Sequence, residues 1–145
     1  KKESAGLPIT YGIQSVALEV PLPDNSQTLV LDMMVSHFLN ADERTHLVRE
    51  IMRVLKPGGW LFFKTFLLDG DTHAERLLRD HPADEPGSYI HPAIGVQEHV
   101  FTEEEIHELL SENFFVHTVA KSHRHKAPGN AAKRRSISVY AQKMG

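Results

Sequence analysis

The chain of 145 residues contains no cysteine, and this absence excludes disulfide scaffolds, thiolate zinc sites, iron–sulfur clusters and cysteine nucleophiles. It also has no apolar run close to the roughly 20 residues that a membrane-spanning helix needs, and its first residues do not resemble a signal peptide. We therefore expect a cytoplasmic protein with no membrane segment. The 41% hydrophobic and 24% charged residues are usual for one globular domain, which we expect to span residues 1–145.

Acidic residues are missing from the C-terminal part of the chain. From Lys121 onward there are seven Lys or Arg and no Asp or Glu, whereas residues 1–120 carry nine basic and nineteen acidic side chains. The net charge of −3 argues against a general nucleic-acid-binding protein. The simplest explanation of the basic end is a solvated pair of strands with their loop, but binding of RNA, an acidic partner or an anionic ligand is left open.

Apolar segments bounded by turn residues predict β-strands. They cover residues 9–13, 28–35, 60–68, 114–121 and 134–142. The run over 28–35 is almost continuously apolar, as in a parallel strand that is covered on both faces. The last two segments are joined by a basic, glycine-containing loop, which predicts an antiparallel pair at the end of the sheet.

Capping boxes predict where two helices begin. They are formed by Asn40 with Glu43, before a helix over 41–55, and by Thr102 with Glu105, before a helix over 103–112. A short helix over 72–79 is followed by a long loop rich in Pro and Gly. Since strand, helix and strand in this order imply parallel strands, the predicted fold is α/β: a three-layer, mostly parallel sheet with an antiparallel C-terminal hairpin.

Ligands of open α/β sheets bind outside the carboxyl ends of the parallel strands. This rule selects Gln14 and Ser15 after the first predicted strand, residues 32–37 after the second and residues 64–71 after the third. Position alone selects them, so a loop or capping role is the alternative for each.

Two stretches of the sequence resemble class I S-adenosylmethionine-dependent methyltransferases. Residues 21–32 read PLPDNSQTLVLD, and residues 49–61 read REIMRVLKPGGWL. They are similar to the family's segment from its third strand through its fifth, and the signature of strand, helix, R-x-L-K-P-G-G and strand is quite specific to it. The resemblance implies a Rossmann-like sheet, S-adenosyl-L-methionine as cofactor, and methyl transfer to a small-molecule acceptor.

The resemblance also implies an N-terminally truncated domain. The family's glycine-rich turn after its first strand and the ribose-binding acid after its second have no counterpart here, and Gly58-Gly59 follows a helix, whereas nucleotide sites use a helix N-terminus. We therefore expect the chain by itself to be inactive and to bind the cofactor weakly or not at all. The cofactor contacts that the chain retains are assigned to Gln14, Ser15, Asp32 and Met33.

The segment over residues 87–101 is the expected substrate wall, because the family's substrate-binding insertions lie at the matching place. His91 and His99 are the candidates for removing a proton from a hydroxyl or amine acceptor, although methyl transfer from a sulfonium depends mainly on alignment. Substrate contacts are expected from His37, Lys64, Tyr89, Glu98 and Arg135. The alternative is a packed loop whose polar side chains satisfy local backbone groups.

The residues also suggest two further kinds of site. His91 with Glu98 and His99, or His123 with His125, could ligate a metal, but neither group forms a closed set at a familiar spacing, so no metal is expected. Residues 133–135 beside Lys64 could clamp a phosphate or a carboxylate.

Two alternatives to a methyltransferase also follow from the sequence. The first is another Rossmann-type enzyme, such as a nicotinamide dehydrogenase. The second is a non-catalytic module whose basic end holds RNA or an acidic protein, for which salt-sensitive RNA binding would be the sign.

Overall fold

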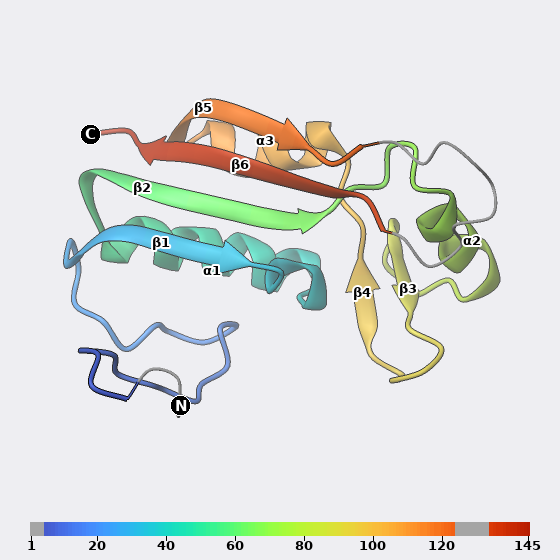
Figure 1. Ribbon diagram of the computed structural model, residues 1–145, viewed down its shortest axis with the longest axis horizontal. Helices are drawn as coiled ribbons and strands as arrows, with labels where there is room; N and C mark the ends of the chain where they lie inside the picture. The colour runs from blue at the N-terminus through green and yellow to red at the C-terminus, as the bar shows by residue number, and fades with distance from the viewer. Residues whose placement is uncertain (1–4, 124–133) are drawn as a thin grey trace.

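The computed structural model, which describes residues 5–123 and 134–145, has a four-stranded mixed sheet at its centre (Figure 1). The strands lie in the order β1 (Gln27–Met33), β2 (Leu55–Phe66), β6 (Ser136–Lys143) and β5 (Phe114–Lys121). β1 and β2 are parallel, whereas β2 with β6 and β6 with β5 are antiparallel. The predicted α/β fold with an antiparallel C-terminal pair is confirmed.

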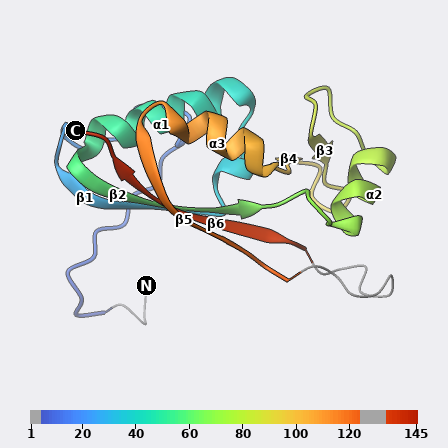
Figure 2. The same ribbon diagram turned by 90° about the horizontal axis from the view of Figure 1, so that it is seen from above.

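Two helices, α1 (Ala41–Val54) and α3 (Glu103–Ser111), pack on the same face of this sheet. The view from above shows both helices together on one side of it (Figure 2). In the part of the chain that the structure describes, no helix covers the other face, so the third layer of the predicted architecture is not formed there. The uncovered face carries exposed apolar side chains, among them Leu29, Leu31, Met33 and Phe115.

The helices begin where the capping boxes predict. Asn40 Oδ1 accepts a hydrogen bond from the Glu43 backbone N–H at 3.0 Å, and the Glu43 carboxylate accepts one from the Asn40 N–H at 2.9 Å. Thr102 and Glu105 form the same reciprocal pair before α3. Each box satisfies two N–H groups that the first helical turn leaves without partners, and the two predicted helices are correct to within one residue at each end.

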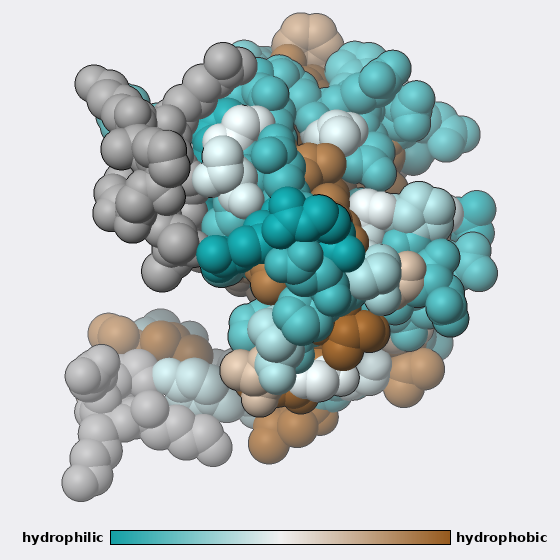
Figure 3. Space-filling model, turned by 90° about the vertical axis from the view of Figure 1, so that its right-hand side faces the viewer, coloured by the Kyte–Doolittle hydropathy of each residue, from teal (hydrophilic) through white to brown (hydrophobic). Residues whose placement is uncertain are grey.

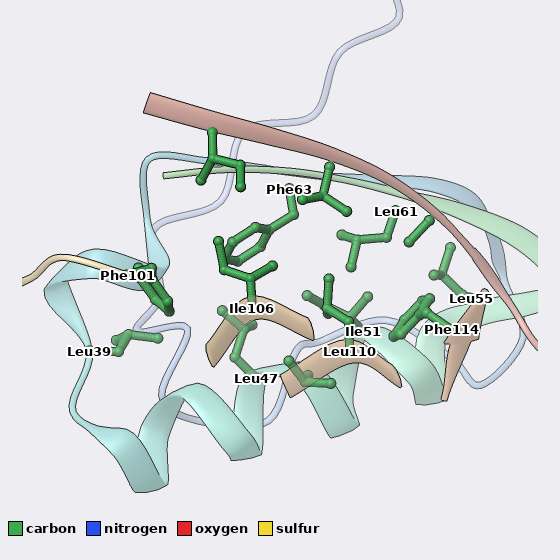
Figure 4. Close-up of a cluster of buried hydrophobic side chains, with 14 of the residues drawn as sticks. Leu39, Leu47, Ile51, Leu55, Leu61, Phe63, Phe101, Ile106, Leu110 and Phe114 are labelled. Carbon is green, nitrogen blue, oxygen red and sulfur yellow. The ribbon is translucent and has the colours of Figure 1, made fainter. Parts of the chain in front are cut away.

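The main core lies between the sheet and these two helices (Figure 4). Alternate residues of β2 and β6 face it, and Leu61, Phe63 and Val139 are each 1% exposed. Ile51 of α1 and Leu110 of α3 close it from the other side. Because residues along the whole length of β2 belong to this core, the core holds the carboxyl end of β2 in place.

The junction between α1 and β2 differs from the prediction. The strand was expected to begin at residue 60, but β2 begins at Leu55, which pairs with β1 before residues 56–59 bulge out of register. Gly59 allows this turn, because a Cβ atom there would lie only 2.9 Å from the Lys56 carbonyl oxygen.

A smaller unit lies beyond the carboxyl end of β2. It consists of α2 (Thr72–Asp80) and an antiparallel pair of β3 (Ser88–Ile90) and β4 (Gln97–His99). The short helix is confirmed, but the uninterrupted loop predicted after it is wrong. Strands of three residues are too short to produce a periodic signal in the sequence, and their turn is closed by a hydrogen bond from the His91 N–H to the Val96 carbonyl at 2.8 Å.

The strand predicted over residues 9–13 is absent, and the side chains of Ile9, Tyr11 and Ile13 are exposed. A strand is stable only beside a hydrogen-bonding neighbour, and no strand in the described ranges pairs with this segment. The prediction is wrong here because an apolar pattern does not show whether a partner strand is present.

Candidate active site

The carboxyl ends of β1 and β2 point toward the end of the molecule where α2, β3 and β4 lie, at the right of Figure 1. Seen from that end, the coloured surface is mainly hydrophilic, with smaller hydrophobic patches (Figure 3). Four polar side chains near the ends of these strands interact with one another through hydrogen bonds or charge, and we call them the strand-end cluster: His37, Tyr89, Glu98 and Arg134.

Asp32, near the end of β1, braces the turn that leads to the cluster. Its carboxylate accepts hydrogen bonds from the Val35 backbone N–H at 3.2 Å and from the Ser36 hydroxyl. Burial raises the pKa of Asp32 above its ordinary value, and these hydrogen bonds oppose that change. Met34 in the same turn has a φ of 63°, a left-handed conformation that is uncommon for a residue with a side chain and that often occurs at functional sites.

His37 lies in the 3-10 helix η1 (Ser36–Phe38) that follows this turn, and it is 4% exposed. Its ring centroid lies 3.9 Å from that of Phe38 and 4.9 Å from that of Phe66. Burial lowers the pKa of His37, the charge of Glu98 opposes this effect, and the charge of Arg134 adds to it. Burial therefore favours the neutral imidazole, whose buried Nδ1 atom has no hydrogen-bond partner among the described residues.

Tyr89 connects the other members of the cluster. It stands directly opposite Glu98 in the β3–β4 pair, and its hydroxyl donates to the Glu98 carboxylate. Arg134 Nη1 donates to the same hydroxyl at 2.7 Å. Burial and the hydrogen bond to Glu98 raise the pKa of Tyr89 to about 12, although Arg134 acts in the opposite direction. The phenol is therefore protonated throughout the neutral range.

Arg134 joins the cluster to the end of the main sheet. Its guanidinium lies over the Phe66 ring, 4.0 Å from the ring centroid, and its Nε donates to Asp71 at 3.2 Å. Asp71 is fully buried, caps α2 through two N–H groups of the first turn, and accepts from the Arg135 backbone N–H at 2.8 Å. Asp71 lies in the predicted range 64–71, but no local signal in the sequence links it to Arg134 and Arg135, because these two residues lie more than sixty positions away.

Arg135 and Lys64, two of the predicted substrate contacts, are placed differently. Arg135 Nη2 donates to the Ser122 carbonyl at 2.8 Å and Nη1 to the Asp69 carbonyl, so this side chain links two loops. Lys64 alternates along β2 with the buried Phe63 and lies on the sheet face that carries no described helix. Neither side chain is among the contacts of the strand-end cluster that the structure gives.

His91 and His99 lie on different sides of the hairpin. The His91 ring centroid is 6.4 Å from that of Tyr89. His99 pairs with Ser88, whose hydroxyl is 2.9 Å from its Nδ1, and it faces away from Glu98 because adjacent strand residues point to opposite faces. In the ranges that the structure describes, no three His, Asp or Glu side chains converge as metal ligands, and His125 lies outside those ranges.

The ion pair of His99 with Glu105 makes a testable contribution to stability, with Nε2 3.4 Å from the carboxylate. Burial alone would raise the pKa of Glu105, but hydrogen bonds from His99 and Thr102 outweigh burial and lower it to about 2. A depressed carboxyl pKa stabilises the folded state above the unfolded value of 4.5, and this stabilisation is lost as the pH falls from 4.5 to 2.

We therefore expect Glu105→Gln to make the unfolding free energy less dependent on pH between 4.5 and 2. Urea unfolding at a series of pH values measures this dependence. The exposed neighbour Glu104→Gln is the matched control, and equal slopes for both variants would contradict the assignment.

The four predicted cofactor contacts lie along the free edge of β1 and in the segment that precedes it. Val16, the neighbour of Ser15, lines a mostly apolar cavity of about 180 Å³ together with Asp32 and Val35. The Gln14 side chain donates to a backbone carbonyl within its own segment, and Met33 is half exposed. Since whole-ligand sites enclose roughly 300–1,000 Å³, this cavity has room for only part of S-adenosylmethionine.

Comparison with known proteins bears on the fold. A family model described as a methyltransferase domain matches residues 1–63. An S-adenosylmethionine-dependent methyltransferase from Methanosarcina mazei superposes with a TM-score of 0.74 and 26% identity, covering 92% of this chain and 66% of that one. The first 63 residues thus match a methyltransferase domain, and the chain has the Rossmann-like α/β fold of S-adenosylmethionine-dependent methyltransferases.

Two further methyltransferases share the fold at lower identity. A putative S-adenosylmethionine-dependent methyltransferase from Listeria monocytogenes gives a TM-score of 0.68 at 16% identity, with coverage of 99% of this chain and 73% of that one. The 1,6-didemethyltoxoflavin-N1-methyltransferase of Burkholderia thailandensis, solved with that compound and S-adenosylhomocysteine, gives 0.61 at 21%, with coverage of 90% and 48%. The chain spans 66% or less of the length of the Methanosarcina and Burkholderia enzymes. No curated protein sequence matches it significantly.

The basic C-terminal end of the chain is used largely for internal contacts. Lys143 Nζ donates to the carbonyls of Met52 and Leu55, each at 2.7 Å, and Lys121 pairs with Glu103. With Arg134 and Arg135 also bonded inside the protein, the C-terminal basic side chains that the structure describes offer little support for an RNA-binding surface. None of the described helices is both long enough and apolar enough to cross a lipid bilayer.

Proposed function

We propose that this chain takes part in methyl transfer from S-adenosylmethionine to a small-molecule acceptor, at the carboxyl ends of β1 and β2. The observation that carries the proposal is the convergence of two features at that edge of a methyltransferase sheet. They are the strained turn after Asp32, next to the candidate cofactor contacts, and the buried strand-end cluster that begins at His37. The first would face the cofactor and the second the acceptor.

The cofactor side is assigned to Gln14, Ser15, Asp32 and Met33. Bound S-adenosylmethionine supplies an activated methyl group on a sulfonium sulfur. The chain's own contribution is to hold the turn after β1 in one conformation, because the Asp32 carboxylate ties down the Val35 N–H and the Ser36 hydroxyl. The cavity of about 180 Å³ beside Asp32 could cover part of the cofactor, since both Val16 and Asp32 line it.

The acceptor side is formed by the strand-end cluster. Alignment of the reacting atoms contributes about 7–11 kcal/mol in reactions of this type, and a cluster held by buried hydrogen bonds is suited to that task. His37 is neutral, so it can accept a proton from a hydroxyl or amine acceptor as the methyl group is transferred. The Burkholderia enzyme named above, solved with 1,6-didemethyltoxoflavin, supports the choice of a small-molecule acceptor.

Saturation-transfer NMR of the 145-residue chain with S-adenosylhomocysteine tests this proposal. We expect transfer to the ligand with a dissociation constant of the order of 1 mM, weak because the cavity beside Asp32 covers only part of the ligand. NADH is the matched control, because a nicotinamide dehydrogenase would prefer it. Equal or stronger transfer to NADH, or none to S-adenosylhomocysteine, would contradict the proposed function.

A further inference from the structure

Resting on the proposed site, we propose that the acceptor carries a carboxylate, and that Arg134 binds it through Nη2. The sequence pointed to residues 133–135 only as a general anion clamp, and to Arg135 as the substrate contact. The structure separates the two arginines.

The hydrogen bonds of Arg134 leave one nitrogen for a ligand. Nε donates to Asp71 at 3.2 Å and Nη1 to the Tyr89 hydroxyl at 2.7 Å, while Nη2 is buried and has no hydrogen-bond partner in the part of the chain that the structure describes. The guanidinium plane is fixed against Phe66, so Nη2 has a defined direction. Because most buried polar atoms in proteins have partners, an unpartnered guanidinium nitrogen in a fixed plane is a natural binding point for an oxygen anion.

A second buried atom without a partner lies in the same cluster. Nδ1 of His37, a residue that is only 4% exposed, has no hydrogen-bond partner in the described ranges. His37 and Arg134 both pack against Phe66, and their charges influence each other. Two polar atoms that lack partners and share one aromatic neighbour would both be satisfied by a single polar ligand that contacts the Phe66 ring.

Arg135 is a weaker candidate for the same role. Its Nε also lacks a partner, but both of its Nη atoms donate to backbone carbonyls in two loops. Its side chain is only 4% exposed, against 16% for Arg134, so a ligand has better access to Arg134.

Glu98 favours a carboxylate over a phosphate. Its side chain accepts the Tyr89 hydrogen bond and acts electrostatically on His37, so it lies in the same small region as the proposed ligand. A monoanion can bind Arg134 beside this acid, whereas a phosphate dianion would meet stronger repulsion from a carboxylate that water screens little. The structure therefore points to acceptors with a single negative charge.

The test uses the 145-residue chain and three probes of similar shape: benzoate, its neutral isostere benzamide, and phenyl phosphate. Binding is followed by changes in backbone amide shifts. We expect benzoate to shift the amides of Phe66, Tyr89 and Arg134, and to bind about 10- to 100-fold more tightly than benzamide, as for a charged hydrogen bond. Phenyl phosphate should bind more weakly than benzoate.

Arg134→Gln should lose about the same 10- to 100-fold in benzoate affinity, while Arg79→Gln, an exposed arginine paired with Asp80 on α2, should lose none. Benzamide binding as tightly as benzoate, or benzoate binding unchanged in Arg134→Gln, would overturn the proposal. The comparison of probes needs no variant, so it decides the question even if Arg134→Gln does not fold. Binding of S-adenosylhomocysteine without binding of benzoate would leave the proposed function in place and remove only the carboxylate.

Discussion

Replacing Asp71 by alanine is expected to destabilise the fold by about 3–5 kcal/mol, as measured for other buried charge pairs that lose one partner. The Asp71 carboxylate is fully buried and accepts four hydrogen bonds, two from the first turn of α2, one from the Arg135 N–H and one from Arg134 Nε. Its loss leaves these donors without an acceptor and a guanidinium without its nearest counter-charge. The α2 unit would then detach first from the main sheet.

Urea unfolding followed by circular dichroism measures this loss. Asp71→Asn keeps one acceptor oxygen for the helix cap and should fall between the wild type and Asp71→Ala. Asp84→Ala is the matched control, because Asp84 is exposed in the loop after α2. If Asp71→Ala costs no more than Asp84→Ala, the carboxylate does not hold α2 to the start of β6.

Replacing Tyr89 by phenylalanine is expected to cost about 1.5–3 kcal/mol, the range for hydrogen bonds to charged groups. The change keeps the ring, which is fully buried, and removes the hydroxyl that joins Glu98 to Arg134. Two charged groups then lose a shared partner inside the protein. Tyr140→Phe is the matched control, because Tyr140 is 44% exposed and should tolerate the same change at little cost.

The same residue predicts a dependence on alkaline pH. Burial and Glu98 raise the pKa of Tyr89 from 10.0 to about 12, so the folded state favours the protonated phenol. The resulting stabilisation is complete below pH 10 and is lost as the pH rises toward 12. Unfolding free energies between pH 9 and 12 should therefore fall more steeply for the wild type than for Tyr89→Phe. Parallel curves would contradict the role of the hydroxyl.

Elements with a strong local signal could be predicted from the sequence. Asn40 and Thr102 begin helices because a capping side chain and its reciprocal acid stand within four residues of each other. The strand over residues 9–13 could not be judged in this way, because a strand depends on a neighbour that no local pattern shows. The β3–β4 pair was missed because strands of three residues have no measurable period.

The candidate site was predictable only in part, for a related reason. The strand-end rule and the family resemblance led to His37, Tyr89 and Glu98, which the structure brings together. Phe66 and Asp71 were not singled out, because their importance arises from contacts with Arg134, far away in the sequence. The neighbouring Arg135 has the same chemistry as Arg134, and only the fold distinguishes the arginine that ties loops together from the one with a nitrogen left for a ligand.

The most direct test of the central claim is to locate S-adenosylhomocysteine on the 145-residue chain by amide chemical-shift mapping. The ligand should shift the amides around Ser15 and those of residues 32–37, at the carboxyl end of β1, while residues 56–59 at the opposite end of β2 stay unchanged. Shifts concentrated at residues 56–59, or no shifts at millimolar ligand, would contradict the assignment of methyl transfer to this edge of the sheet.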